Sequence, residues 1–370
     1  MSLTSPADET TLEIDATAGP EPVVCAYNEW DPLEEVIVGT VAGACVPSWD
    51  VSLEATLPED WWDFFRAHGG APFPAEQVAA AEEDLTELVH ILEGEGVTVR
   101  RPEPVDYARP YSTPDWSSPG GLYAAMPRDI LLVVGDLIIE SPMAWRSRYY
   151  EIQAYRSLLQ EYFRRGARWI AAPRPALRDD FYDAGYDPEG QGRFVATEAE
   201  PTFDAADFIR CGRDLFVQRS HVTNRIGIEW VRRHLGPDFK VHEVTLADPH
   251  PMHIDASLMP LAPGKLLINP ERVPVVPAQF RGWDVLEAPM PRIPDSHPLY
   301  MTSKWINMNV LMLDEERVIV EREDEPMIRA LRNFGLKPIP CGFLRFNTFG
   351  GSFHCATADI RRRGGLRSYF

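Results

Sequence analysis

The feature that most constrains the fold is an order of elements that recurs five times along the chain. Each recurrence predicts an apolar strand or strand pair, then a segment with apolar residues at helical spacing, then another short strand. Modules of one kind bury their faces against each other, either in an open stack or in a closed ring. Closure leaves no unprotected sheet edge, so the repeat favours a closed propeller-like α/β ring, with an ordinary mixed sheet as the alternative.

The strands of the five units are short apolar runs bounded by turns. They are EEVIVGT with VTVRRP, ILLVVGDLIIE with RWIAAP, DAADFIRCGRDLFVQRS with FKVHEV, HIDASLMPLAPGKLLINPER with WDVLEAP, and MNVLMLDEERVIVE with LKPIPC. The helices are placed by their apolar faces, at residues 78–92, 152–163 and 228–235, around Ala278, and at 327–334. The fourth and fifth units carry the weaker signals.

The charge balance and the cysteines exclude whole classes of protein. The 370 residues include 36 basic and 56 acidic side chains, a net charge of −20, which argues against nucleic-acid or anionic-membrane partners. The chain has no run of about 18 apolar residues, so no membrane span is expected. The cysteines form no Cys-x-x-Cys pair, which indicates a reducing compartment; they are Cys25, Cys45, Cys211, Cys341 and Cys355.

The N-terminal segment, residues 1–22, has neither a basic residue nor an apolar core. It fits neither a secretory signal nor an Arg-rich transit peptide. We therefore expect a disordered acidic tail on a cytoplasmic protein, with residues 23–370 forming one domain.

Cys355 stands in the segment FGGSFHCATADI, after two glycines and a serine. Such a small, flexible backbone would let a thiol stand open at the mouth of a strand. In extended geometry Cys355, Thr357 and Asp359 would share one face, and His354 would lie on the other. The other four cysteines are interpreted as buried apolar residues.

The segment DPHPMHIDAS offers His253 and Asp255, which would project side by side from a strand. Two alternatives stay open. His250, His253 and Asp255 have the spacing of metal ligands, although no second cluster completes a coordination shell, and His253 could be a structural histidine.

Acidic residues at strand ends complete the candidate set. Asp204 and Asp207 lie in FDAADF, and Asp129 lies at the entrance to an apolar strand in PRDILL. Such residues can simply form turns, but with a cysteine and a histidine they predict a pocket for a planar cation, since a carboxylate accepts two parallel N–H bonds from guanidinium. A thiolate would attack the guanidinium carbon while histidine moves protons. This chemistry predicts an amidino-cysteine intermediate and ping-pong kinetics.

Long stretches of the chain resemble the glycine amidinotransferase and inosamine-phosphate amidinotransferase family. The resemblance lies in NEWDPLEEVIVGT, MPRDILLVVGDLIIESPMAWRSR, FDAADFIRCGRDLFVQRSHVTN, DPHPMHIDAS, SKWINMNVLMLDEERV and GGSFHCATADIRRRG. It implies a five-module α/β propeller, as in arginine deiminases and dimethylarginine hydrolases. It also implies transfer of the amidino group of L-arginine to a primary amine, with release of L-ornithine.

The resemblance also assigns roles to residues. Cys355 matches the nucleophile of GG-x-FHC, His253 the histidine of PMHID, and Asp204 the aspartate that opens FDAAD. The substrate-binding set that it implies is Asp129 and Asp255 for the guanidinium, Arg272 and Ser303 for the carboxylate, and Met252, Thr302 and His250 nearby. No cofactor or metal is implied. The oligomeric state stays open, with a homodimer among the options, and Trp61 and Trp62 could lie in the core or at an interface.

Three positions depart from the glycine-type pattern. The chain has His250, Ser352 and Thr302 where those members usually have Asn, Gly and Ser. The acceptor is therefore expected to be glycine, another amino acid or a small primary amine. Two alternatives remain: a hydrolase on the same scaffold that makes citrulline, and a non-catalytic protein that binds a guanidino ligand.

Overall fold

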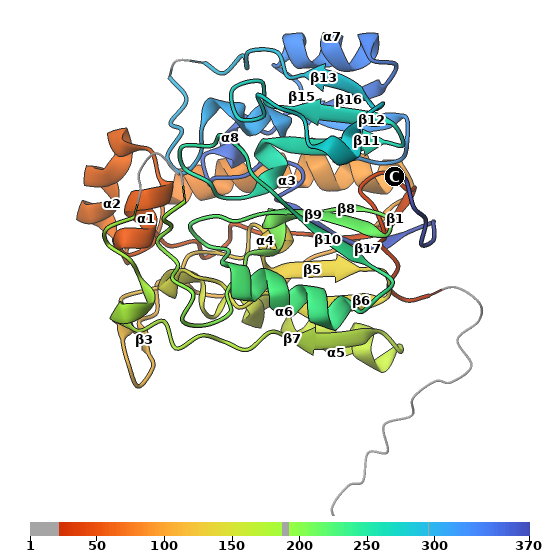
Figure 1. Cartoon of the computed structure of the whole chain (residues 1–370). Coiled ribbons are helices and arrows are strands. Elements are labelled where there is room, and N and C mark those ends of the chain that lie inside the picture. The colour runs from red at the N-terminus through yellow and green to blue at the C-terminus, as the bar shows by residue number, and fades with distance from the viewer. Residues whose placement is uncertain (1–21, 187–191, 295) are drawn as a thin grey trace, which may run out of the picture.

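The computed structural model describes residues 22–186, 192–294 and 296–370. Nearly all of the predicted tail, residues 1–21, lies outside the described residues. Five three-stranded sheets dominate the described part, and in each one an antiparallel pair is extended by a parallel third strand (Figure 1). This repeated sheet confirms the five units expected from the sequence.

The second to fifth units follow the order strand, strand, helix, strand. They are β5 (Leu131–Val134), β6 (Leu137–Glu140), α5 (Arg156–Arg164) and β7 (Arg168–Ala171); β8 (Phe208–Cys211), β9 (Asp214–Gln218), α6 (Arg225–Leu235) and β10 (Lys240–Val244); β11 (Leu258–Ala262), β12 (Lys265–Ile268), the 3₁₀ turn η7 (Ala278–Phe280) and β13 (Asp284–Glu287); and β14 (Leu311–Met312), β15 (Arg317–Glu321), α7 (Glu325–Asn333) and β16 (Lys337–Cys341).

The first unit is assembled from both ends of the chain. It contains β1 (Leu33–Val38), α3 (Ala75–Gly94) and β2 (Thr98–Arg100), and its antiparallel partner strand is β17 (Thr357–Arg362). Leu33 pairs with Arg362, and Val38 pairs with Thr357. The last strand of the chain therefore completes the first sheet.

Short elements connect these units. An insertion between β1 and α3 carries α1 (Val51–Thr56) and α2 (Trp62–His68), which lie together at the left of Figure 1, apart from the sheets. The hairpin β3 (Tyr111–Ser112) and β4 (Ser117–Ser118) leads into the single turn α4 (Pro127–Ile130), and α8 (Leu344–Asn347) follows β16.

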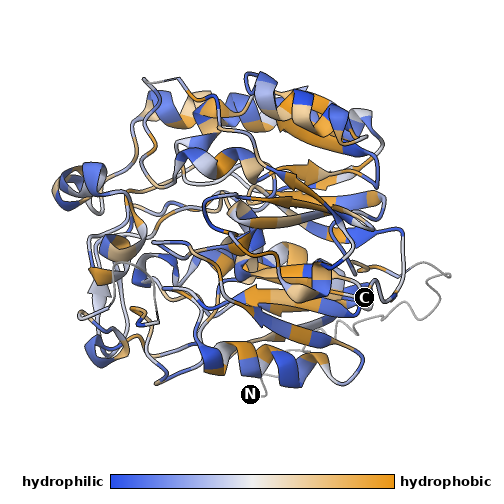
Figure 2. Cartoon of the chain, turned by 45° about the horizontal axis from the view of Figure 1, so that its top comes forward, coloured by the Kyte–Doolittle hydropathy of each residue, from blue (hydrophilic) through white to orange (hydrophobic). Residues whose placement is uncertain are grey.

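Local signals explain where the helices begin and end. The side chain of Asn224 caps α6 by accepting from the backbone N–H of Gly227 at 2.8 Å, and Gly236 ends the helix with φ of 77°. Asp324 caps α7 in the same way, with the N–H of Met327 at 3.2 Å. Both helices bury only one face, because their outer faces are polar (Figure 2).

Four apolar clusters join each unit to its neighbours and so close the ring. Each cluster is identified by strand residues from adjacent units: Ile37 with Ile138, Leu132 with Val217, Phe216 with Leu266 and Val320, and Val38 with Ile319. A backbone hydrogen bond of 2.8 Å from Leu33 to Leu313 also links the first unit to the fifth. The expectation of a closed ring is thereby confirmed. No helix within the described ranges is both long and apolar enough to cross a bilayer.

Two local predictions were wrong. The helix expected around Ala278 is a single 3₁₀ turn, because Pro274 and Pro277 remove backbone donors from that segment. Phe163, placed on the buried face of its helix, is 57% exposed. All five cysteines are buried and unpaired by disulfides, as expected for four of them.

Candidate active site

A cavity of about 470 Å³ lies among the loops that connect the strands. Every residue of the predicted substrate-binding set lines it, namely Asp129, His250, Met252, Asp255, Arg272, Thr302 and Ser303. Cys355 and His253 line it as well, whereas Asp204 lies behind His253. The structure therefore brings together the residues that the sequence placed far apart.

Cys355 lies in a turn, residues 353–356, that immediately precedes β17. Its backbone N–H donates to Asn309 Oδ1 at 2.9 Å, and the N–H of Ser352 donates to the same atom at 3.1 Å. A Cβ on Gly351 would lie 2.7 Å from Cys355 Cβ and 2.5 Å from Met126 Sδ, so only glycine fits there. The expectation that Cys355 shares an extended face with Thr357 and Asp359 is wrong, since the strand begins only at Thr357.

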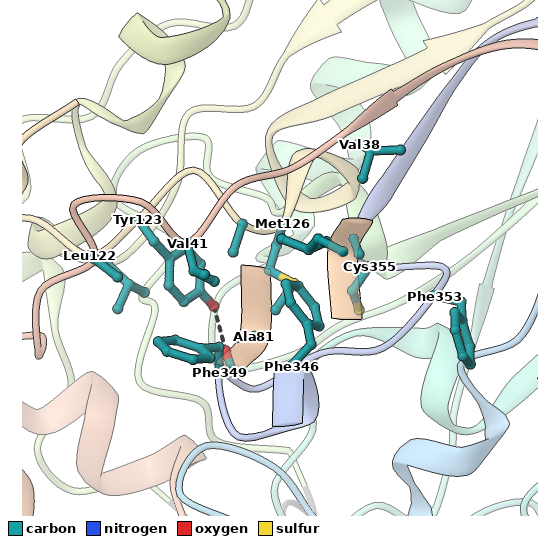
Figure 3. Packing of buried hydrophobic residues seen from close by; sticks show 14 of the residues in the cluster. Val38, Val41, Ala81, Leu122, Tyr123, Met126, Phe346, Phe349, Phe353 and Cys355 are labelled. Atoms are coloured by element: carbon teal, nitrogen blue, oxygen red, sulfur yellow. Dashed lines mark hydrogen bonds between the residues drawn. The ribbon is translucent and has the colours of Figure 1, made fainter. Parts of the chain in front are cut away.

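One side of the Cys355 loop, residues 350–356, packs on an apolar cluster. Figure 3 shows Cys355 beside Met126 and Val38, with Phe353 on the far side of the loop. Tyr123 fixes the preceding residues by donating its hydroxyl to the Phe349 carbonyl at 3.0 Å (Figure 3). The thiol is thus held on a rigid apolar support, and its polar neighbours approach from the cavity side.

His253 adopts a left-handed backbone conformation with φ of 62°, and the 3₁₀ turn η6 (Ile254–Ala256) follows it. The prediction that His253 and Asp255 lie side by side on a strand is therefore wrong. Its Nε2 lies 3.0 Å from Asp204 Oδ2, and its Nδ1 lies 3.6 Å from Asp129 Oδ1. A non-glycine residue in this conformation costs about 1–3 kcal/mol, a strain that is found most often at functional sites.

Arg148 connects the two carboxylates that contact His253. Its guanidinium lies 2.9 Å from Asp129 Oδ2, 3.5 Å from Asp204 Oδ2 and 2.9 Å from Glu151 Oε2. Burial would lower the pKa of His253, but Asp129 and Asp204 outweigh it and raise that pKa well above its usual value. The histidine is therefore an imidazolium at neutral pH.

At Cys355 burial sets the direction of the pKa shift, whereas at His253 the neighbouring carboxylates outweigh burial. Burial, with a further contribution from Asp255, raises the pKa of Cys355 to about 12, although a hydrogen bond with His253 lowers it. The thiol therefore keeps its proton until another positive charge reaches the pocket.

Asp255 lies directly beneath the thiol. Its Oδ2 lies 2.7 Å from His354 Nδ1, 2.7 Å from Asn309 Nδ2 and 3.5 Å from Cys355 Sγ. Burial would raise the pKa of Asp255, but the hydrogen bond with His354 lowers it. The other oxygen, Oδ1, is buried without a hydrogen-bond partner among the described residues, as are the Oδ1 atoms of Asp129 and Asp204.

Buried carboxylate oxygens without donors are costly unless a ligand supplies the hydrogen bonds. A guanidinium carries five N–H donors in a plane and a positive charge, so it matches this set. Arg272 offers the complementary charge within the same cavity. It contacts Asp248 at 3.1 Å and donates to Ser303 Oγ at 3.2 Å.

The geometry also bears on the metal alternative. The set His250, His253 and Asp255 is not assembled, because His250 Nδ1 lies 3.1 Å from the Ala55 carbonyl. Ligand atoms of Asp129, His253 and Cys355 do lie within 4.8 Å of one another. To bind this trio, a metal ion would have to displace the protons of both His253 and Cys355, because it takes the neutral imidazole and the thiolate as ligands.

Sequence reasoning assigned no role to Asn309 or Arg148, although both stand in stretches that carry the resemblance. It placed His354 on the opposite face of a strand, but the turn directs this side chain to Asp255 and to Glu29, 3.2 Å away. Asp207 does not line the cavity. It accepts from Ser220 and Thr223 at 2.6 Å, and Thr223 in turn accepts from the N–H of Asp204 at 3.1 Å.

Comparison with known proteins finds relatives of high identity over nearly the whole chain. The chain is 60% identical to the L-arginine:L-lysine amidinotransferase of Pseudomonas savastanoi pv. phaseolicola over 349 residues, which cover 94% of this chain and 96% of the relative. It is 53% identical to the mitochondrial glycine amidinotransferase of Danio rerio, with 95% of this chain and 87% of the relative covered. No protein-family model matches the chain.

Solved structures give the same result. An amidinotransferase of the saxitoxin biosynthetic pathway from Microseira wollei superposes with a TM-score of 0.88 at 53% identity, over 94% of this chain and 99% of the other. Inosamine-phosphate amidinotransferase from Streptomyces griseus gives 0.84 at 39% identity, over 94% and 99%. Dimethylarginine dimethylaminohydrolase, at 16% identity and a TM-score of 0.56 over 88% and 98%, shares the five-module α/β propeller fold alone. The chain belongs to the amidinotransferase family.

Proposed function

We propose that the protein transfers the amidino group of L-arginine through Cys355 to the side-chain amine of L-lysine. One observation carries the proposal: the Cys355 thiol lies 3.5 Å from Asp255 in a cavity where buried carboxylate oxygens lack hydrogen-bond donors. Beside it, Asp129 and Asp204 raise the pKa of His253 well above its usual value. These features match a guanidinium substrate, a thiol nucleophile and a proton donor for the leaving amine.

In the first half-reaction Asp129 and Asp255 hold the guanidinium. The arriving cation offsets the carboxylates that raise the pKa of Cys355, so the thiol proton is lost to solvent. The Cys355 sulfur then forms a bond to the guanidinium carbon, and the bond from that carbon to Nε of arginine breaks. His253 gives its proton to the departing nitrogen, and ornithine leaves a cationic amidino-cysteine behind.

In the second half-reaction a neutral primary amine attacks the same carbon. His253, now neutral, takes a proton from that amine, and the carbon–sulfur bond breaks to restore the thiolate and the imidazolium. With lysine as acceptor the product is homoarginine. Both half-reactions use one cavity in turn, so the proposal includes ping-pong kinetics.

Three features support lysine as the acceptor. Lysine resembles the departing ornithine, with one additional methylene, so Arg272 and Ser303 can bind the carboxylate of both. Asp60 lines the cavity, is exposed, and makes no hydrogen bond or ion pair among the described residues, so it is available to an α-ammonium group. The relative that is 60% identical is named for lysine as acceptor. Glycine would occupy little of a 470 Å³ cavity.

The direct test is to supply the purified protein with arginine and either lysine or glycine, and to quantify amino acids by mass spectrometry. Equal amounts of ornithine and homoarginine are expected with lysine, and little guanidino product with glycine. Citrulline without a guanidino product would instead assign the protein to the hydrolases. Cys355→Ala should still bind arginine but should lose about 10⁴-fold or more in turnover, whereas a binding protein would have no turnover to lose.

The role of Asp60 can be tested against Glu59, the neighbouring residue in the same 3₁₀ turn. Asp60→Asn should raise the KM for lysine about three- to tenfold with little change in kcat, because one exposed ion pair with the substrate is lost. Glu59→Gln removes the neighbouring exposed carboxylate, which does not line the cavity, and should change neither constant. Equal KM values for the two variants would remove Asp60 from the acceptor site.

A further inference from the structure

The outer wall of the cavity is formed by two segments that are distant in the sequence. The insertion with α1 and α2 contributes Thr56, Pro58, Asp60 and Trp61, and the loop before Ser303 contributes Leu299 and Met301. The segments meet at Tyr300. Its ring centroid lies 4.3 Å from that of Trp61 and 5.0 Å from that of Phe64. We call these three side chains the aromatic contact.

The wall is fastened on either side of the aromatic contact. His250 Nδ1 lies 3.1 Å from the carbonyl of Ala55, which ties the insertion to the segment that carries His253. Met301 packs closely on the Cys355 loop: a Cβ on Gly350 would lie 2.9 Å from Met301 Cβ. Gln77 also donates to the Tyr300 hydroxyl at 3.4 Å. The ring of Tyr300 is therefore held between the insertion and the loop above Cys355.

An amidino-cysteine can be attacked by an amine or by water, and His253 would accept the proton of either one. If water attacks, a carbon–oxygen bond forms, the carbon–sulfur bond breaks, and urea leaves while Cys355 is regenerated. The net reaction is then arginine and water to ornithine and urea. This side reaction differs from citrulline formation, in which ammonia leaves and ornithine does not.

We infer that the aromatic contact decides between these two nucleophiles by keeping bulk water away from the amidino-cysteine until the acceptor is bound. The inference rests on the proposed function. The faces of large aromatic rings are broad and apolar and exclude water, and Trp61 itself lines the cavity. His253 would accept a proton from an amine or from water equally well. The selection between the two nucleophiles must therefore come from the wall, which controls which of them enters the cavity. His250, a departure from the glycine-type pattern, contributes by fastening that wall.

The test measures how arginine is divided between products. Tyr300→Ala and Trp61→Ala open the aromatic contact at its two sides, and Tyr300→Phe keeps the ring. Asp63→Ala alters a fully exposed side chain on α2, the helix that carries Phe64. Each protein is incubated with arginine alone and then with arginine and lysine. Ornithine, urea, citrulline and homoarginine are quantified by mass spectrometry, and circular dichroism checks the fold.

With arginine alone, wild type, Tyr300→Phe and Asp63→Ala should release about one ornithine per protein and then stall. The two alanine variants should continue, with ornithine and urea in equal amounts and a ratio of urea to homoarginine at least about tenfold above wild type when lysine is present. A folded alanine variant that keeps the wild-type ratio would overturn the inference. Absence of ornithine from wild type under all conditions would instead reject the proposed function itself.

Discussion

Two buried clusters of charge meet where Asp255 contacts His354, and their difference shows how a functional cluster can be recognised. The floor cluster consists of Glu29, Arg128, Arg210, His354, Asp359 and Arg362, and the pocket cluster consists of Asp129, Arg148, Asp204, His253 and Asp255. In the floor cluster every buried polar side-chain atom has a partner. In the pocket cluster three carboxylate oxygens, the Oδ1 atoms of Asp129, Asp204 and Asp255, accept no hydrogen bond from the described residues.

The two clusters also differ in how burial changes their carboxyl groups. In the floor cluster burial would raise the pKa of Glu29 and of Asp359, but the neighbouring arginines hold both pKa values well below their usual range. In the pocket cluster burial raises the pKa of Asp129, and His253 and Arg148 only partly oppose it. Burial of Asp255, in contrast, is outweighed by its hydrogen bond with His354 of the floor cluster, which lowers the pKa of Asp255. A saturated cluster stabilises the fold, whereas an unsaturated one is prepared for a ligand.

The floor cluster should therefore matter for folding more than for chemistry. Arg210 donates to Glu29 at 2.6 Å, to Asp359 at 2.6 Å and to the Val133 carbonyl at 3.1 Å, which links three units of the ring. Arg210→Met should lower the free energy of unfolding by about 3–5 kcal/mol, because it leaves buried carboxylates without their counter-charge. Urea denaturation measures this, and a loss under about 1 kcal/mol would break the comparison.

The pocket cluster should matter for chemistry more than for folding. Asp129→Asn should lower kcat/KM for arginine by about 10²–10³-fold, since one carboxylate that holds the guanidinium and orients His253 is neutralised. The free energy of unfolding should stay equal or rise slightly, because a poorly compensated buried charge is removed. If Asp129→Asn instead unfolds as easily as Arg210→Met, the pocket cluster is structural as well.

Asn309 lies between the clusters and tests which one it serves. Its side chain holds both the Cys355 loop and Asp255, so Asn309→Ala should lower kcat by about 10²-fold through misplacement of the thiol. Asn307 is a matched control two residues away, since it donates to the buried Asp324 at 2.9 Å. Asn307→Ala should reduce stability with kcat preserved. Similar kcat losses in both variants would indicate a general disturbance of the segment.

The pH dependence of Cys355 gives a smaller but graded effect. Because the pKa of Cys355 is raised to about 12, its thiolate fraction in the free protein increases with pH. Alkylation by iodoacetamide should accelerate about tenfold per pH unit between pH 7 and 10 without a plateau. Asp255→Asn should alkylate faster at each pH, since Asp255 raises that pKa. Cys355→Ala corrects for other thiols, and a plateau below pH 9 would contradict the assignment.

The sequence predicted what depends on local pattern. The hairpin of β5 and β6 appears where two apolar runs flank Gly135 and Asp136, and the apolar faces of α3, α6 and α7 appear where helical spacing placed them. The glycines of GGSFHC predicted a thiol that stands open beside a small-residue backbone. Gly351 gives a steric reason for that backbone, but the thiol itself is buried.

What failed depends on contacts between distant residues. Face assignments by alternation hold only inside a strand, so they misplaced His354, which lies in a turn. The floor cluster could not be predicted, because Glu29, Arg210 and Asp359 come from three separate stretches and carry no shared local signal. The repeat gave the number of units, but the partner of β1 was found only from its register with β17.

The pairing of β17 with β1 has a consequence for folding during translation. A ribosome releases β1 early and β17 only after the other four units, so the first sheet lacks one strand during most of translation. Cys355 lies two residues before the start of β17. Its contacts with Asp255 and Asn309 can form only when that strand docks on β1. A nascent chain stalled before residue 357 would hold nearly every other pocket residue and remain inert. Docking of β17 would then close the ring and complete the pocket in one step.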